Sequence, residues 1–141
     1  MWFNPIIKWL LLSPLHNLVS KNMMLITYAG LKSGKVYMIP VNYIRNGDVL
    51  ITTSQKNRVW WRNLRGGAKV ILRVQGKDMK ASVQVTEDDE SVAKVLLIIF
   101  QGTPQLARYY NVGLTSQDQP IPEDVNNAAQ KSVIITSTLS R

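Results

Sequence analysis

Residues 25–54, which read LITYAGLKSGKVYMIPVNYIRNGDVLITTS, decide the fold of this chain. They hold three runs rich in β-branched and aromatic residues, a composition that favours strands. Glycine-containing segments at 29–34 and 46–47 separate the runs. Asn46-Gly47 between two such runs is the strongest short signal for a β-hairpin, because both residues accept a positive φ angle. We therefore predict strands at 25–28, 35–44 and 49–54, the third returning antiparallel to the second.

The remaining chain adds a second hairpin and a late strand. Residues 70–75 and 79–86 alternate apolar and polar side chains on either side of a turn predicted at 76–78. Residues 132–138, SVIITST, form a final β-rich run. Five or six strands, mostly in hairpins, predict a mainly β protein built as a small antiparallel barrel whose openings are covered by helices. Pro40 inside the second strand predicts an edge, a bulge or a place where something other than a strand pairs.

Several segments carry helix signals. Asn4-Pro5 and Ser13-Pro14 each combine an N-cap residue with proline at the first helical position. Residues 87–100 begin with an acidic turn, and their apolar residues recur three and four positions apart. The predicted helical segments are 4–12, 14–20, 57–66, 87–100 and 104–110. By contrast, residues 113–130 are polar and hold Pro120 and Pro122, so we expect a surface loop there.

Length and composition exclude several classes of chemistry. A chain of 141 residues has the length of one domain, so we expect a single domain over 1–141. The absence of cysteine excludes disulfides, a thiolate nucleophile and Cys-based metal sites. One histidine, His16, makes a Ser-His-Asp triad or a His-rich metal site implausible, and no metal site is expected. Within the domain we expect a helical cap at 1–20, barrel strands at 23–86, and helices, a loop and the last strand at 87–141.

The charge is unevenly distributed along the chain. Residues 1–80 carry thirteen Lys or Arg against two carboxylates, whereas residues 81–141 carry four against seven. A basic surface attracts anions such as a phosphorylated cofactor, acidic lipid or nucleic acid. Because the basic residues concentrate in one loop and one helix, we rank nucleic acid last and predict no nucleic-acid partner.

The N-terminal segment does not match a targeting sequence. Its apolar run at 6–12 is broken by Lys8, no basic region precedes it, and it is far shorter than a membrane-spanning helix. Trp2, Phe3 and Trp9 could lie at a membrane interface, or pack over the core or against a second subunit. We favour packing and a cytoplasmic location, with peripheral membrane contact through residues 1–15 as the open alternative.

Two short segments combine residues suited to an anionic, ring-bearing ligand. Residues 30–35, GLKSGK, offer glycines for close backbone approach and lysines for charge, although such a composition is also common in solvated turns. Residues 54–65 place Trp60-Trp61 beside Arg62, Asn63 and Arg65. Indole rings can wall a flat ring, and guanidinium groups bind phosphate or carboxylate. One of the two tryptophans is expected to plug the barrel end instead.

Three segments carry a resemblance to a known family: LLLSPLHNLVS at 10–20, the stretch at 25–54, and WWRNLRGGAKVILRVQGK at 60–77. In order and spacing they resemble the deazaflavin-dependent nitroreductase and quinone reductase family. That family belongs to the split β-barrel, FMN-binding-like flavin/deazaflavin oxidoreductases, and the likeness covers about residues 4–90. It implies hydride transfer from the reduced deazaflavin coenzyme F-420, or alternatively FMN, to a quinone, nitroaromatic or similar conjugated acceptor.

The resemblance also implies residue roles. Lys32 and Ser33 fall where the family holds the phosphate and acidic tail of the cofactor, and Pro40 and Val41 fall where it packs the deazaflavin ring. Ser54 falls where a hydroxyl faces the space between cofactor and acceptor. The implied cofactor-binding residues are Lys32, Ser33, Gly34, Lys35, Tyr37, Pro40, Val41, Thr52, Ser54, Gln55, Trp60 and Asn63. After hydride transfer the acceptor oxygen also needs a proton, and the candidate catalytic donors are solvent or the hydroxyls of Ser54, Tyr109 and Tyr110, the two tyrosines being alternatively wall residues.

Leu31, Tyr37 and Gln55 stand where the family usually has basic residues, which weakens the expected hold on the acidic tail. The residues that can compensate are Lys35, Arg58, Arg62 and Arg65. These departures keep an alternative open, namely a non-catalytic protein of the same fold that binds a flavin, haem or lipid-like ligand. Because barrels of this superfamily typically pair two copies, we expect a homodimer.

Overall fold

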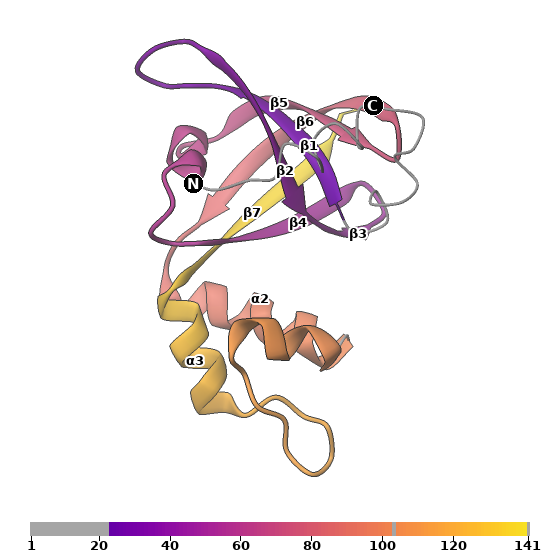
Figure 1. Ribbon diagram of the computed structural model, residues 1–141, viewed down its shortest axis with the longest axis vertical. Helices are drawn as coiled ribbons and strands as arrows, with labels where there is room; N and C mark the ends of the chain where they lie inside the picture. Colours follow the sequence, from indigo (N-terminus) through magenta and orange to yellow (C-terminus); the bar gives the residue numbers. More distant parts are fainter. Residues whose placement is uncertain (1–22, 103, 141) are drawn as a thin grey trace. The chain divides into compact units, whose positions relative to one another are not determined.

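The computed structural model describes residues 23–102 and 104–140 (Figure 1). The helices predicted at 4–12 and 14–20 lie outside these residues. The described chain divides into two compact units. Unit 1 comprises residues 23–53, 58–85 and 135–140, and unit 2 comprises 54–57 and 86–134.

Seven strands form one sheet in the order β2-β1-β5-β6-β7-β4-β3. The sequence predicted five or six strands, and the extra one arises because the run at 35–44 divides at Tyr43. The strands are β1 (Met23–Ala29), β2 (Val36–Asn42), β3 (Ile44–Asn46), β4 (Val49–Gln55), β5 (Ala68–Val74), β6 (Lys77–Thr86) and β7 (Ser132–Leu139).

The connection from β2 to β3 explains why the sheet curls. These strands lie at opposite ends of the sheet order, yet Tyr43 alone separates them in the chain. The two edges must therefore approach each other, as they do when a sheet closes toward a barrel. We call the place where these two edges meet the seam. Across it, the Thr52 hydroxyl of β4 donates a 2.8 Å hydrogen bond to the Asn42 carbonyl at the end of β2. The curled antiparallel sheet confirms the expected split-barrel class, and Pro40 does lie on an edge strand.

Replacing Thr52 with valine is expected to lower the free energy of unfolding by about 1–2 kcal/mol. The substitution keeps the shape of this buried side chain but leaves the Asn42 carbonyl without its donor. Urea denaturation of Thr52→Val and of the exposed control Thr138→Val measures the difference. Equal stability of the two variants would mean that the hydrogen bond does not stabilise the seam.

The turns partly differ from the prediction. The hairpin at Asn46-Gly47 is confirmed, although Asn46 pairs with Val49 in the ladder and only Gly47 has a positive φ, of 62°. The turn predicted at 76–78 was wrong. Val74 pairs with Lys77, so Gln75 and Gly76 form a two-residue turn, with φ of 49° and 81°. Positive φ at both residues matches the right-handed twist of the flanking strands, and glycine at the second position makes this geometry accessible.

The alternation predicted for the second hairpin is confirmed. Val70, Leu72 and Val74 of β5 and Ala81 and Val83 of β6 are buried in unit 1. The basic aromatic helix is shorter than the predicted 57–66, because only η2 (Trp60–Leu64), a 3-10 turn, forms. Gly66 and Gly67 follow it with φ of 79° and 95°, a backbone conformation that favours glycine and ends the turn.

Unit 2 contains α2 (Asp89–Gly102), η3 (Pro104–Tyr110) and α3 (Pro122–Gln130). The Asp88 carboxylate accepts a 2.9 Å hydrogen bond from the Ser91 N–H, which caps α2. Hydrogen bonds with the Ser91 side chain, and then with its backbone, lower the pKa of Asp88. Val92, Leu96 and Phe100 form its buried face, and α2 packs against α3 (Figure 1). Among the described residues, no helix combines the length and the apolar character that crossing a membrane requires.

The loop predicted at 113–130 was wrong for its second half, where α3 forms. Pro122 was interpreted as a loop signal, but it occupies the first turn of the helix, where its missing N–H has no intrahelical partner to lose. The helix buries Val125, Ala128 and Ala129. The apolar face was too short to stand out among the polar residues around it.

Candidate functional site

The loop between β1 and β2 spans residues 30–35 and is closed by backbone hydrogen bonds. The Gly30 N–H donates to the Lys35 carbonyl at 2.8 Å, and the Gly34 N–H donates to the Gly30 carbonyl at 2.9 Å. A Cβ at Gly30 would lie 3.1 Å from both Ser33 Oγ and Cε2 of Tyr37. Glycine at position 30 therefore allows the loop to fold closely against the Tyr37 ring.

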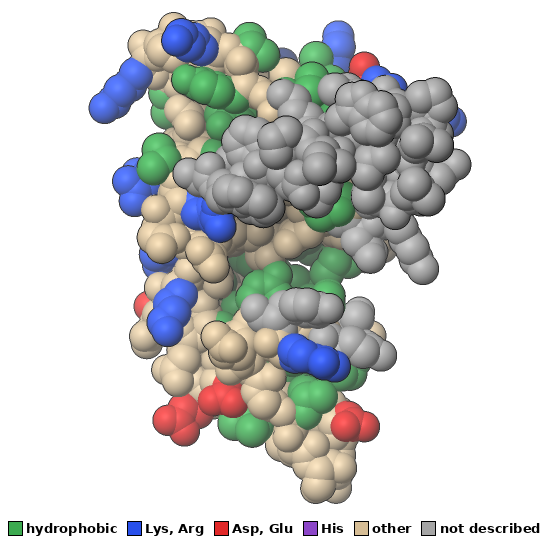
Figure 2. All heavy atoms as spheres, viewed as in Figure 1, with side chains coloured by type: hydrophobic (Ala, Val, Ile, Leu, Met, Phe, Trp, Pro, Cys, Tyr) green, Lys and Arg blue, Asp and Glu red, His purple; other side chains and the backbone are tan. Residues whose placement is uncertain are grey.

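The tip of this loop presents backbone N–H groups and two lysine side chains. The backbone N–H groups of Lys32 and Ser33 donate to no described residue, and neither Lys32 nor Lys35 is ion-paired with one. Residues 30–35 contain no carboxylate. Figure 2 shows basic side chains, coloured blue, at the end of this hairpin, which Figure 1 draws at the top left. Adjacent N–H groups together with two ammonium groups can hold an anion such as phosphate.

Asn63 joins this loop to the η2 turn. Its Oδ1 accepts a 3.1 Å hydrogen bond from the Leu31 N–H, and its Nδ2 donates a 3.0 Å hydrogen bond to the Trp60 carbonyl. Leu31 and Asn63 are 32 residues apart in the chain. One side-chain amide therefore fixes the basic loop against the aromatic turn.

A row of aromatic rings runs beside the loop. Tyr28 and Tyr37, paired across β1 and β2, stack with ring centroids 5.6 Å apart, and Tyr28 meets Trp60 at 6.2 Å. Trp60 is only 5% exposed, whereas Tyr37 is 42% exposed. The accessible surface of the row is therefore the Tyr37 ring rather than the tryptophan pair, and it can stack on a flat ligand. We call the set of Tyr28, residues 30–35, Tyr37, Trp60 and Asn63 the loop–turn site.

Trp61 fills the interior, as expected for one of the two tryptophans. It is 1% exposed, and the guanidinium groups of Arg62 and Arg65 lie 5.6 Å and 4.9 Å from its ring centroid. Such cation–π contacts hold both arginines over the ring. The two arginines proposed as compensating charges are thus positioned by Trp61 in the turn next to Asn63.

Three further predicted residues of unit 1 lie in strands. Pro40 pairs with Leu25 and is half-buried, and Val41 pairs with Met24 and is buried. Thr52 is buried and its hydroxyl donates to the Asn42 carbonyl. The structure therefore gives Thr52 a role in the seam, while Pro40 retains partial exposure.

The other predicted residues belong to unit 2, and the contacts that build the loop–turn site do not include them. Ser54 and Gln55 end β4, and the Ser54 hydroxyl donates a 3.3 Å hydrogen bond to the Gln55 carbonyl. Tyr110 packs on Phe100 with centroids 5.2 Å apart. Tyr109 lies in η3, and its side chain is outside the described atoms.

The pKa of Tyr28 is raised above the usual 10.0, first by burial and then by the neighbouring Tyr37. Burial also raises the pKa of Tyr43, while Arg45 and a hydrogen bond with Gln75 oppose that shift. Both phenols therefore keep their protons to higher pH in the folded protein than in the unfolded chain.

The stability of the protein is consequently expected to fall as pH rises above 10.0, where the unfolded chain ionises these phenols first. The two phenols contribute fully to stability below that pH. This contribution is lost as the pH rises through their raised pKa values in the folded protein. Urea denaturation across this range should give a steeper loss for the native protein than for Tyr28→Phe/Tyr43→Phe. Identical pH dependence would contradict the raised pKa values.

Two parts of the loop–turn site were not predicted from the sequence, namely the Tyr28 ring and the Leu31 N–H. A signal for Tyr28 existed, because Tyr28 and Tyr37 flank the loop and a hairpin places them opposite each other. The Leu31–Asn63 hydrogen bond had no local signal, because it joins distant segments.

Comparison with known proteins gives one family match. The family model described as "F420H(2)-dependent quinone reductase" matches residues 14–125. No curated protein matches the chain. Within the described residues, no group of three or more His, Cys, Asp or Glu is placed to hold a metal ion.

Solved structures share the fold at low sequence identity. A protein described as "F420-H2 Dependent Reductase (FDR-A)" has a TM-score of 0.52 and 16% identity, covering 82% of this chain and 94% of its own. An "F420 Reductase" has a TM-score of 0.50 and 16% identity over 89% and 93%. A "domain-swapped dimer" has a TM-score of 0.53 and 16% identity over 84% and 81%. At this identity the likeness concerns the fold.

Proposed function

The chain belongs to the F420H(2)-dependent quinone reductase family, and on that premise we propose that it transfers a hydride from reduced coenzyme F-420 to a quinone, a nitroaromatic or a similar conjugated acceptor. When bound, the deazaflavin would supply the hydride, so the chain itself needs no nucleophile. A quinone gains one hydride and one proton to become a hydroquinone. The task of the protein is to hold and orient both molecules and to exclude water.

The hydrogen bond between the Leu31 N–H and Asn63 Oδ1 is the observation that carries this proposal. It fixes a positively charged loop, whose N–H groups at Lys32 and Ser33 have no partner among the described residues, beside a row of aromatic rings. Lys32, Ser33, Gly34 and Lys35 would hold the phosphate and acidic tail, which such donors fit. Tyr37, with Pro40 and Val41 on the same strand, would line the deazaflavin ring.

The proton for the acceptor would come from solvent or from a hydroxyl. Ser54, Tyr109 and Tyr110 are the candidates, because a hydroxyl can donate a proton to an oxygen that gains negative charge. Gln55, at the end of the same strand as Ser54, would contact the cofactor. These assignments predict loss of turnover, with retained cofactor binding, when the responsible hydroxyl is removed.

Separate titrations of the purified protein with coenzyme F-420, FMN and haem test the cofactor. We expect the deazaflavin to bind with the lowest dissociation constant, and menadione to oxidise its reduced form only when the protein is present. Tighter binding of FMN would favour the alternative cofactor. Failure of all three to bind would contradict the proposal.

A second candidate function is non-catalytic binding of a flavin, haem or lipid-like ligand by the same fold. It is favoured by Leu31, Tyr37 and Gln55, which replace the basic residues usual for holding the acidic tail. Binding of a ligand without oxidation of the reduced deazaflavin by any quinone or nitroaromatic would establish this alternative.

Replacing Asn63 with alanine is expected to weaken deazaflavin binding about tenfold, because the loop loses its hydrogen bond to the turn. Fluorescence titration measures the dissociation constant. The exposed Asn126→Ala in α3 is the matched control and should bind like the native protein. If Asn63→Ala bound the cofactor with unchanged affinity, the contact between the loop and the turn would not contribute to cofactor binding.

The proposal also covers the oligomeric state of the protein and its location in the cell. A homodimer is supported by one solved structure of the same fold that is described as a domain-swapped dimer. We further propose a single functional domain and a cytoplasmic location, with peripheral membrane contact through residues 1–15 as the alternative to packing against the core or a second subunit. Light scattering gives the oligomeric state, and sedimentation with anionic vesicles tests membrane contact.

A further inference from the structure

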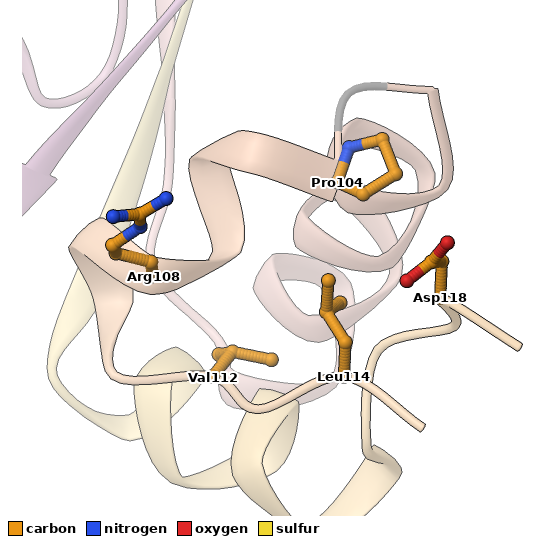
Figure 3. A pocket seen from close by; sticks show the side chains of 5 residues that line it. All are labelled: Pro104, Arg108, Val112, Leu114 and Asp118. Atoms are coloured by element: carbon orange, nitrogen blue, oxygen red, sulfur yellow. The ribbon is translucent and has the colours of Figure 1, made fainter. Parts of the chain in front are cut away.

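Unit 2 contains a pocket of about 500 Å³ that the proposed function does not use (Figure 3). Five residues line it: Pro104, Arg108, Val112, Leu114 and Asp118. Pro104 and Arg108 come from η3, and the other three come from the segment that follows it. The volume falls within the usual range for sites that bind small molecules.

Hydrogen bonds fix the segment that forms one wall. The Asp118 N–H donates to the Thr115 carbonyl at 3.0 Å, and the Thr115 N–H donates to the Gln119 carbonyl at 2.7 Å. The Gly113 N–H donates to the Asp124 carboxylate of α3 at 2.9 Å. The lining residues of this segment are therefore held in place before any ligand arrives.

The floor of the pocket is apolar. Val112 is buried, and Leu114 is a large apolar side chain that remains 38% exposed. Figure 3 shows Leu114 pointing up toward Pro104, between the two charged side chains. An apolar body placed over these residues would remove their surface from water, which favours binding.

The two charged residues stand at opposite sides of the pocket. Figure 3 shows Arg108 on one side and Asp118 on the other. Neither side chain forms an ion pair or hydrogen bond with another described residue. A guanidinium group binds a carboxylate through two parallel hydrogen bonds, and a carboxylate accepts hydrogen bonds from hydroxyl or ammonium groups.

We infer that this pocket binds an elongated, largely apolar carboxylic acid that carries a hydrogen-bond donor at its other end. The carboxylate would pair with Arg108, the donor would face Asp118, and the apolar body would cover Val112 and Leu114. A simple anion leaves the apolar floor uncovered and meets the negative charge of Asp118. A purely apolar molecule leaves the charges of Arg108 and Asp118 without partners. The arrangement therefore selects against simple anions and against purely apolar molecules.

Three related molecules probe this specificity. Para-hydroxyphenylbutyrate has all three features, phenylbutyrate lacks the donor, and para-hydroxyphenylbutyramide lacks the charge. Heteronuclear NMR of the isotopically labelled full chain, without cofactor, should show saturable shifts at residues 104–118 with the first probe. We expect weaker binding of the other two, by about tenfold for the uncharged amide.

Two substitutions assign the contacts. Arg108→Gln should weaken binding of para-hydroxyphenylbutyrate about tenfold, to the level of the uncharged amide. Asp118→Asn should reduce the preference for the hydroxylated probe over phenylbutyrate, because the hydroxyl then meets a neutral acceptor in place of a charged one. Asparagine also tolerates the positive φ of 58° at position 118, so the loop should be preserved.

Matched controls are Lys94→Gln and Glu123→Gln, which make the same charge changes at exposed positions on α2 and α3. They should bind all three probes as the native chain does. Equal weakening by Arg108→Gln and Lys94→Gln, or the absence of saturable shifts at 104–118, would overturn the inference. Because no deazaflavin or quinone is present, this result is independent of the proposed reductase activity.

Discussion

Replacement of both Lys32 and Lys35 with glutamate is expected to raise the dissociation constant for coenzyme F-420 about a hundredfold. The two ammonium groups are exposed at the tip of the loop–turn site, and no carboxylate within residues 30–35 offsets them. Lysine would form charge-assisted hydrogen bonds with phosphate, whereas glutamate would repel it. Salt screens such exposed charges, so the effect should be largest at low ionic strength.

Lys77→Glu/Lys80→Glu is the matched control, because it changes the net charge equally at exposed positions of β6 in the same unit. This variant should bind the cofactor within a few-fold of the native protein. If both double variants weaken binding equally, the general field of the basic protein is responsible and the loop is not the phosphate site. Circular dichroism should show that both variants fold.

The largest effect on stability is expected at Trp61. Replacing it with alanine should lower the free energy of unfolding by about 3–5 kcal/mol, because the fully buried indole leaves a cavity and Arg62 and Arg65 lose their ring contacts. Urea denaturation followed by far-ultraviolet circular dichroism measures the change. Trp61→Phe should lose less free energy of unfolding, because phenylalanine keeps an aromatic ring in the same space.

The neighbouring Val59 provides the control for this prediction. It is 62% exposed just before η2, so Val59→Ala should change the free energy of unfolding by less than about 0.5 kcal/mol. A small loss for Trp61→Ala, similar to that of Val59→Ala, would show that the core of unit 1 relaxes around the missing ring.

Strand periodicity was the most dependable signal in the sequence. The alternation around Val70, Leu72 and Val74 identified the buried face because side chains of a strand point alternately to opposite sides. The boundaries were less accurate, as the shifted turn at Gln75-Gly76 shows, because several neighbouring residues accept turn conformations. Pro122 misled for a related reason, since proline is common in loops and is also favoured at the first position of helices.

The candidate site was predictable where its signals are local. Glycine, lysine and serine within residues 30–35 indicated an anion-binding loop, and the resemblance identified the family that the comparisons confirm. The pairing of that loop with Asn63 could not be derived, because the partners are 32 residues apart in the chain and three strands intervene. The pocket between η3 and the segment that follows it also had no sequence signal.

By itself, the sequence determined the β-rich class, the main hairpins and the chemical character of the loop, because these depend on side-chain periodicity and on the conformations that single residues accept. Only the tertiary structure decided that Thr52 joins the edges of the sheet, that Tyr37 rather than Trp60 is the accessible ring, and that Asn63 holds the loop. The physical reason is that burial and long-range hydrogen bonds depend on which distant segments the curled sheet brings together.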